Sequence, residues 1–213
     1  MNRVQRARTD AALAVVAILL FAGFFWLGLY VTHHGEPPVL WAFAQRVRGH
    51  AIGLAWIFTN MGWPQVLAPL YLVTIAIAIF KPEWRVRALY VLAVALICWG
   101  AADGFQHFFG RPRREDWLIR HEHAFSYPSS HAAIATGFYF LWGVVLLRSR
   151  LPALARYGAC ALLFAVTLGI MWSRLALAAH YPTDVAGGLV LGLVVSLLAA
   201  SMVKVFAAPG VDL

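Results

Sequence analysis

Three short segments concentrate the reactive and charged side chains of this chain. Two of them, Gln106–Arg114 and Tyr127–His131, read QHFFGRPRR and YPSSH, and the third, Ser173–Asp184, reads SRLALAAHYPTD. The third places an arginine, a histidine six residues later and an aspartate four residues after that between two hydrophobic stretches. A fixed positive fork, a nucleophile or base, and an anion that orients it are the groups that phosphate chemistry needs. Titratable groups at a membrane boundary are costly, so their presence there indicates a function.

The third segment predicts a histidine nucleophile supported by a carboxylate. His180 can attack phosphorus and form a phosphohistidine that water later hydrolyses. Asp184 lies four residues on, at the start of a helix, where it can face back toward His180. It would accept a hydrogen bond from one ring nitrogen and leave the other free as the nucleophile. The alternative for this pair alone is an interfacial histidine beside a helix-capping aspartate, but Arg174 and the second segment favour the reactive pair.

The other segments supply groups that would bind and protonate a phosphate ester. His131 begins a helix and would protonate the leaving oxygen as a general acid, although simple interfacial exposure also explains it. Ser129 and the backbone N–H groups of residues 129–131 lie at the same helix N-terminus, which can cradle a phosphate. An ordinary serine cap is compatible with that role. Arg113 and Arg174 would clamp the non-bridging oxygens and stabilise charge in the transition state.

The composition is that of a membrane protein. Of the 213 residues, 62% are hydrophobic and 12% are charged, whereas soluble domains are about 45–50% apolar. The run Ala11–Val31 is long enough to cross a bilayer and is predicted to be a span, not a cleaved signal peptide. Cys98 and Cys160 lie inside apolar runs and are expected to be core residues, without a disulfide or a metal. The net charge of +8 does not indicate nucleic acid, because the basic residues sit at membrane edges.

We predict an all-α, polytopic membrane protein that forms one membrane-embedded domain over residues 1–213, with its motifs in residues 103–190. Six spanning helices are expected, at residues 11–31, 63–80, 88–108, 131–148, 154–173 and 184–206. Pro64 suits the first turn of the second helix, where a missing N–H costs nothing. Residues 38–59 mix aromatic and apolar side chains with polar ones, which predicts an amphipathic helix in the outer interface. The alternative for this segment is a seventh, poorer span.

The basic residues predict the orientation of the helices. Ten of the 17 lysines and arginines fall on one side of the six-helix path, which the positive-inside rule assigns to the cytoplasm together with both chain termini. The other seven, all arginines, and all eight histidines fall on the opposite, periplasmic or extracellular side of an inner (plasma) membrane. Five of these seven lie in or beside the three segments, which indicates that they hold an anion. Asp103, near the outer end of the third helix, is expected to pair with one of the arginines.

Together these residues resemble the motifs of the type 2 phosphatidic acid phosphatase superfamily, which are Lys-x6-Arg-Pro, Pro-Ser-Gly-His and Ser-Arg-x5-His-x3-Asp. The third motif is matched at every fixed position, by Ser173, Arg174, His180 and Asp184. The second is matched at its other positions but carries Ser130 where glycine is usual. The resemblance covers the third to sixth helices by motif and the N-terminal third only by layout.

The first motif departs from the family pattern. Aligned on Arg113, the lysine position holds Gln106 and the proline position holds Arg114. A register shifted to Arg111 would place a glycine at the lysine position, so the alignment on Arg113 is preferred. Gln106 keeps hydrogen-bond donors but loses the charge, which Arg111 or Arg114 would restore. The resemblance thus implies a substrate-binding set made of Gln106, Arg111, Arg113, Ser129, Ser130 and Arg174.

The resemblance implies an integral membrane phosphatase that acts at the outer leaflet through a phosphohistidine, with water as the final acceptor and no metal or cofactor. Its substrate would be a lipid phosphate or diphosphate such as undecaprenyl diphosphate, phosphatidylglycerol phosphate or phosphatidic acid. Two alternatives are a lipid phosphotransferase that uses the same site and a lipid-phosphate binder without turnover. A metal site formed by His121, Glu122 and His123 is disfavoured, because their spacing matches no established ligand pattern.

Overall fold

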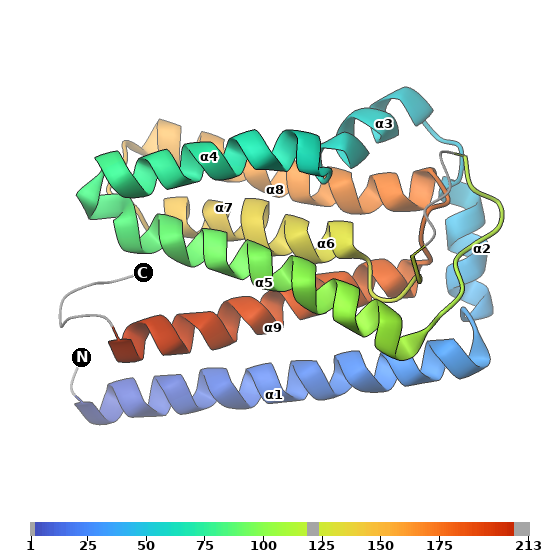
Figure 1. Cartoon of the computed structure of the whole chain (residues 1–213), viewed down its shortest axis with the longest axis horizontal. Helices are drawn as coiled ribbons and strands as arrows, with labels where there is room; N and C mark the ends of the chain where they lie inside the picture. Colours follow the sequence, from blue (N-terminus) through green and yellow to red (C-terminus); the bar gives the residue numbers. More distant parts are fainter. Residues whose placement is uncertain (1–2, 119–123, 207–213) are drawn as a thin grey trace.

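The computed structural model describes residues 3–118 and 124–206, which form a helical bundle (Figure 1). No β-strand occurs in these two stretches. In chain order the elements are α1 (Arg3–His34), α2 (Pro38–Val47), α3 (Ile52–Met61), α4 (Pro64–Phe80), η1 (Pro82–Trp84), α5 (Arg85–Phe109), α6 (Ser130–Ala135), η2 (Thr136–Phe140), α7 (Leu141–Leu147), α8 (Ala153–Ala176) and α9 (Pro182–Phe206). The η2 segment is a π-helical turn that joins α6 to α7 within one span.

The spans agree with those predicted from the sequence. Five helical segments of the described residues are long and apolar enough to cross a membrane: Ala11–His34, Pro82–Phe109, Ser130–Leu147, Ala153–Ala176 and Pro182–Ser201. A sixth is formed if α3 and α4, which are bent by 43°, count as one broken span. The prediction of an all-α, polytopic membrane protein is therefore confirmed.

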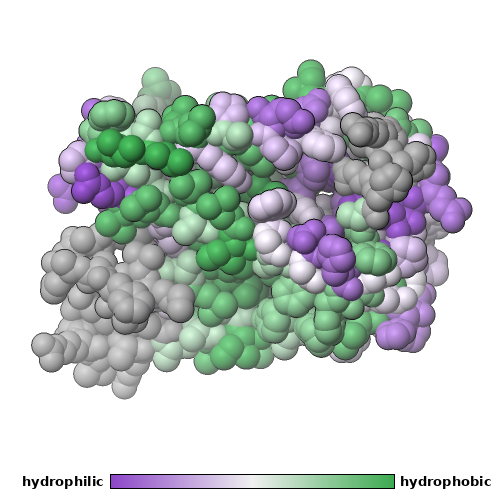
Figure 2. Space-filling model, viewed as in Figure 1, coloured by the Kyte–Doolittle hydropathy of each residue, from purple (hydrophilic) through white to green (hydrophobic). Residues whose placement is uncertain are grey.

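The outer surface of the bundle suits contact with lipid. Leu19, Leu72 and Leu168 lie on three different helices and each is 66% exposed. Hydrophobic residues cover most of the visible middle of the bundle, whereas hydrophilic residues gather over α2 and the neighbouring loops at one end (Figure 2). Such exposed aliphatic surface is stable in hydrocarbon but would be a liability in water.

The segment expected to be one interfacial helix consists of two helices with different settings. Only α2 lies across the end of the bundle, as an interfacial helix would (Figure 1). The chain then breaks at Gly49 and Ala51, which both have positive φ. The following helix, α3, packs along α8 as part of the bundle. At 10 residues α3 is too short to be a seventh span by itself, because a helix of that length covers only about 15 Å.

The reactive segments meet at one end of the bundle. The start of α1 and the end of α9 lie at the opposite end (Figure 1). Gly110, with φ of 61°, ends α5, and the first motif follows in the loop. Ser129 caps α6 by accepting a hydrogen bond from the Ala132 N–H at 3.4 Å. The backbone N–H of Ser129 also donates to the Asp184 carbonyl at 2.9 Å, which ties the start of α6 to the start of α9.

Candidate active site

His180 and Asp184 form a buried pair at the α8–α9 junction. The His180 Nδ1 atom lies 3.4 Å from Asp184 Oδ2, and the two side chains are 1% and 0% exposed. Asp184 is in the first turn of α9 and His180 lies two residues before that helix, so the carboxylate faces back toward the ring.

Arg113 contacts the second ring nitrogen of His180, on the edge of the ring opposite Asp184. Its Nη1 atom lies 3.2 Å from His180 Nε2, and its Nε donates to the Ala124 carbonyl at 2.6 Å. A guanidinium can only donate, so Nε2 must accept and the ring proton must sit on Nδ1, toward Asp184. This tautomer places a lone pair on Nε2, where it could attack an electrophile, and Arg113 holds a positive charge beside it.

Asp184 is held by more donors than the sequence indicated. Its Oδ2 atom accepts from Ser126 Oγ at 2.5 Å and from the Tyr181 N–H at 2.8 Å, besides His180. Its Oδ1 atom accepts from Arg111 Nη1 at 2.5 Å. This network fixes the carboxylate, and through it the orientation of the His180 ring.

Arg111 takes a different place from the one expected. Besides Asp184, it contacts Glu36, with Nη2 2.9 Å from Oε2, and its side chain is only 3% exposed. Glu36 also accepts hydrogen bonds from the backbone N–H and the hydroxyl of Thr183. Arg111 therefore lies behind the His180–Asp184 pair, between two carboxylates that both accept hydrogen bonds from its guanidinium. We interpret it as a positioning residue and not as a phosphate ligand.

Arg174 is fully buried beneath the site. Its Nη1 atom donates to the Thr59 hydroxyl on α3 at 2.6 Å. His131 of the second motif feels the charge of three residues: Arg113 of the first motif and Arg174 and His180 of the third. The three motifs therefore converge at this site.

His131 stands at the cavity wall at the start of α6. Its Nε2 atom is buried and has no hydrogen-bond partner among the described residues. Its ring meets the Trp63 indole edge-on, with centroids 5.8 Å apart. A histidine nitrogen that the protein leaves unbonded in this place is suited to exchange a proton with a bound ester.

Gly62 allows His131 to take this position. A Cβ atom added at Gly62 would lie 2.5 Å from His131 Cδ2, so Gly62→Ala is expected to push the ring aside and lower kcat by roughly 10–100-fold. Gly53→Ala, on the helix α3 that Gly62 follows, is the control, because its added Cβ would have nothing within 4 Å. Steady-state turnover rates of the two purified variants check this. Equal rates would show that the His131 ring position is not critical.

Ser130 and Gln106 contact each other, and they are two of the three departures from the family pattern, the third being Arg114. Gln106 Nε2 donates to Ser130 Oγ at 2.9 Å and to the Pro128 carbonyl at 2.8 Å. An amide has two N–H donors, so both are engaged. With both of its N–H groups donated to protein acceptors, Gln106 acts on the cavity through the Ser130 hydroxyl that it holds.

Arg114 and Asp103 have other partners than the sequence predicted. Arg114 does not restore charge to the site, because its Nη2 and Nε atoms pair with the Asp116 carboxylate at 2.7 and 2.9 Å. This pairing holds the pKa of Asp116 below its usual value. The Asp103 carboxylate lies 3.8 Å from His107 Nδ1, and no arginine of the described chain ion-pairs with it, contrary to expectation.

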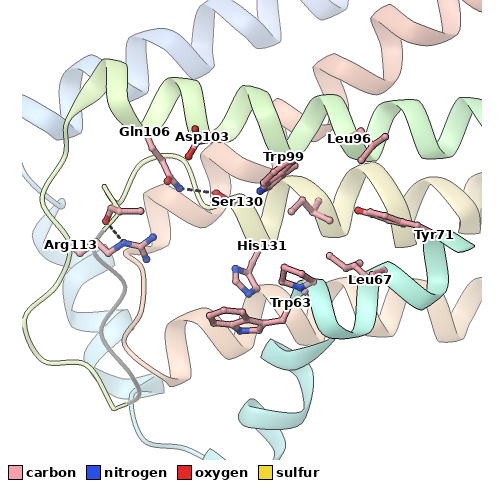
Figure 3. A pocket seen from close by; sticks show the side chains of 15 residues that line it. Trp63, Leu67, Tyr71, Leu96, Trp99, Asp103, Gln106, Arg113, Ser130 and His131 are labelled. Atoms are coloured by element: carbon pink, nitrogen blue, oxygen red, sulfur yellow. Dashed lines mark hydrogen bonds between the residues drawn. The ribbon is translucent and has the colours of Figure 1, made fainter.

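A cavity of about 620 Å³ lies between α4 and α5, beside the start of α6. Its polar end is lined by Asp103, Gln106, Arg113, Ser130 and His131 (Figure 3). Its remainder is lined mainly by apolar side chains, among them Leu67, Tyr71, Leu96, Trp99 and Ile134. Because Leu96 and Trp99 are 48% and 61% exposed on α5, the apolar part reaches the lipid-facing surface.

Three residues of the site escaped the sequence reasoning: Glu36, Thr59 and Ser126. Each is a polar side chain in the site network, and all three are far in sequence from their partners. In the sequence, the one feature that could have pointed to these three residues is a carboxylate or hydroxyl side chain next to an apolar run. His121, Glu122 and His123 lie outside the described residues, and among residues 3–118 and 124–206 no group of three His, Cys, Asp or Glu side chains could hold a metal ion.

The comparisons with known proteins concern the family and the fold of the chain. The model of a family described as the PAP2 superfamily matches residues 84–207, which is more than half of the chain. The chain is also similar in structure to a transmembrane PAP2-type phosphatidylglycerolphosphate phosphatase from Bacillus subtilis, with a TM-score of 0.73 and 22% identity. That similarity covers 91% of this chain and 98% of the other, and it concerns the fold. No curated protein matches the chain.

Proposed function

Because the chain belongs to the PAP2 superfamily, we propose that it is an integral membrane phosphatase that hydrolyses a lipid phosphate or diphosphate. The observation that carries this proposal is the setting of His180. Its Nε2 accepts from Arg113 while its Nδ1 faces Asp184, beside a cavity that is polar at one end and apolar at the other. A nucleophile, an anion clamp and an apolar chamber suit a lipid whose head group is a phosphate.

The first step transfers the phosphoryl group to the protein. His180 Nε2 attacks phosphorus, and the bond between phosphorus and the leaving oxygen breaks. Arg113, which donates to Nε2 in the free protein, then contacts a non-bridging oxygen, and Arg174 supplies the second positive charge. His131 gives its proton to the leaving oxygen, so the lipid departs as an alcohol or, from a diphosphate, as a monophosphate.

The second step hydrolyses the phosphohistidine and regenerates free His180. Water attacks the phosphohistidine, His131 takes a proton from that water, and the phosphorus–nitrogen bond breaks to release inorganic phosphate. Asp184 stabilises the positively charged ring in both steps and keeps its Nδ1 proton in place. The chain's own side chains suffice for both steps, so we expect turnover without a metal or cofactor.

The membrane face of the site is proposed from the distribution of charge, and the lipid substrate is proposed from similarity. We assign the site to the periplasmic or extracellular face of the plasma membrane, because most lysines and arginines precede or follow spans at the opposite end. Phosphatidylglycerol phosphate is the first lipid to test, since the similar solved protein is titled a phosphatase for it. Phosphatidic acid and undecaprenyl diphosphate are the other candidates.

Phosphate release by the detergent-purified protein tests the proposal, with EDTA present and these three lipids as substrates. Release is expected to survive EDTA, to vanish in His180→Ala and to persist in His50→Ala, a matched change at an exposed histidine. A radiolabelled phosphate should become trapped on the wild type as an acid-labile phosphohistidine. Labelling without phosphate release would favour a phosphotransferase, and binding without labelling would favour a lipid-phosphate binder. Release by His180→Ala at the wild-type rate would overturn the mechanism.

A further inference from the structure

The polar end of the cavity carries less positive charge than its motifs suggest. Among the described residues that line it, Arg113 is the one arginine or lysine, and Asp103 brings a carboxylate. Arg174 is fully buried beneath the site, and Arg111 is neutralised between Glu36 and Asp184. The positive charge therefore gathers at the His180 end, where the reacting phosphate would bind.

The Gln106–Ser130 pair presents a neutral donor where the family pattern has a lysine. Both N–H donors of Gln106 are engaged, one by the Pro128 carbonyl and one by Ser130 Oγ. Ser130 Oγ accepts that bond, so its own O–H remains for a bound ester oxygen. A hydroxyl can support a phosphoryl group, but it does not balance the charge of a second phosphate as an ammonium would.

Asp103 lies one helical turn before Gln106 on α5 and lines the same cavity (Figure 3). Within the polar end it is the residue next to the apolar part, which Leu96 and Trp99 line on the same helix. The leaving group must extend from His131 into this part of the cavity. In a diphosphate the leaving group begins with a second anionic phosphate, whereas in a monoester it begins with a neutral carbon chain.

We propose that Asp103, Gln106 and Ser130 make this site selective for a lipid phosphomonoester over a lipid diphosphate. The inference rests on the proposed phosphatase function and narrows its substrate class. The inner phosphate of a diphosphate would face the Asp103 carboxylate, and like charges brought together in this way suppress binding of the wrong partner. A monoester avoids this repulsion, and hydroxyls on its alcohol can donate hydrogen bonds to Asp103.

The test compares a short-chain prenyl phosphate with the diphosphate of the same prenyl alcohol, so that only the second phosphate differs. Rates are followed as consumption of each substrate, because hydrolysis of the diphosphate yields the monoester. The wild-type protein is expected to have the higher kcat/KM for the monoester. Asp103→Asn should raise the relative kcat/KM for the diphosphate roughly tenfold, and Asp103→Asn with Gln106→Lys should raise it further.

Glu115→Gln is the control, because it removes the same charge from an exposed loop position on the same membrane face. It should leave the substrate ratio unchanged. Asp103 is exposed, so its replacement is not expected to disturb folding. The inference would be overturned if both substrates are consumed and the wild type has the higher kcat/KM for the diphosphate. It would also be overturned if Asp103→Asn leaves the ratio of the two kcat/KM values unchanged. Neither result would contradict the phosphatase function. Consumption of neither substrate, nor of any lipid phosphate, would overturn the proposed function and this inference with it.

Discussion

Asp184→Asn is expected to lower kcat by roughly 10³–10⁴-fold, as removal of the carboxylate that orients a reactive histidine does elsewhere. Three donors converge on Oδ2, from Ser126, Tyr181 and His180, and Arg111 donates to Oδ1. Asparagine has one acceptor oxygen, so its NH2 group must face one of these donors. If it faces His180, the Nδ1 atom becomes an acceptor and the ring proton moves to Nε2, which removes the nucleophile.

Asp184 does not line the cavity, so KM for the lipid should change much less than kcat. Steady-state kinetics and the yield of trapped phosphohistidine check this prediction, and both kcat and the yield should fall. Glu83→Gln, an exposed carboxylate before α5, is the control and should behave as the wild type. A kcat within tenfold of the wild type for Asp184→Asn would show that the carboxylate does not set the tautomer of His180.

Arg111→Gln is expected to lower both stability and kcat while leaving KM close to its original value. The change leaves Glu36 and Asp184 as buried carboxylates, 3% and 0% exposed, without their shared cation. Removing one partner of a buried ion pair costs about 3–5 kcal/mol of unfolding free energy. Thermal unfolding in detergent and steady-state kinetics measure the two effects.

The comparison variant is Arg113→Gln. Arg113 lines the cavity and is only half-buried, so its loss should raise KM and lower kcat with a small effect on stability. Adding Glu36→Gln to Arg111→Gln should recover part of the lost stability, because it removes one of the uncompensated carboxylates. If Arg111→Gln instead raised KM as much as Arg113→Gln and unfolded at the wild-type temperature, Arg111 would be a phosphate ligand, as its motif position suggests.

The fold followed from the sequence because its main determinants are local and additive. A run of about 20 apolar residues is long enough to cross a bilayer whatever its neighbours are, and five such runs became helices at the predicted places. The segment 38–59 was harder, because its mixed polarity fits an interfacial helix and a bent pair equally well. Its division into α2 and α3 depended on how α3 packs against α8, which periodicity alone does not reveal.

The site was predictable where its members are close in the sequence. His180 lies two residues before α9 and Asp184 lies in the first turn of that helix, so their contact at a spacing of four residues is a local one. Ser129 as a cap on α6 is likewise a local consequence of the chain leaving an extended segment for a helix.

The remaining assignments needed the tertiary structure, because a donor binds whichever acceptor the packing brings near it. Arg111 meets Glu36 across 75 residues, Arg174 meets Thr59 across 115, and Gln106 meets Ser130 across 24. An arginine in a motif looks the same in sequence whether it faces a phosphate or a buried carboxylate. The sequence by itself determined the spans, the membrane face that the three motifs share, and the pairing of His180 with Asp184. Only the packing of the helices decided which arginine lines the cavity and which one holds the carboxylate behind it.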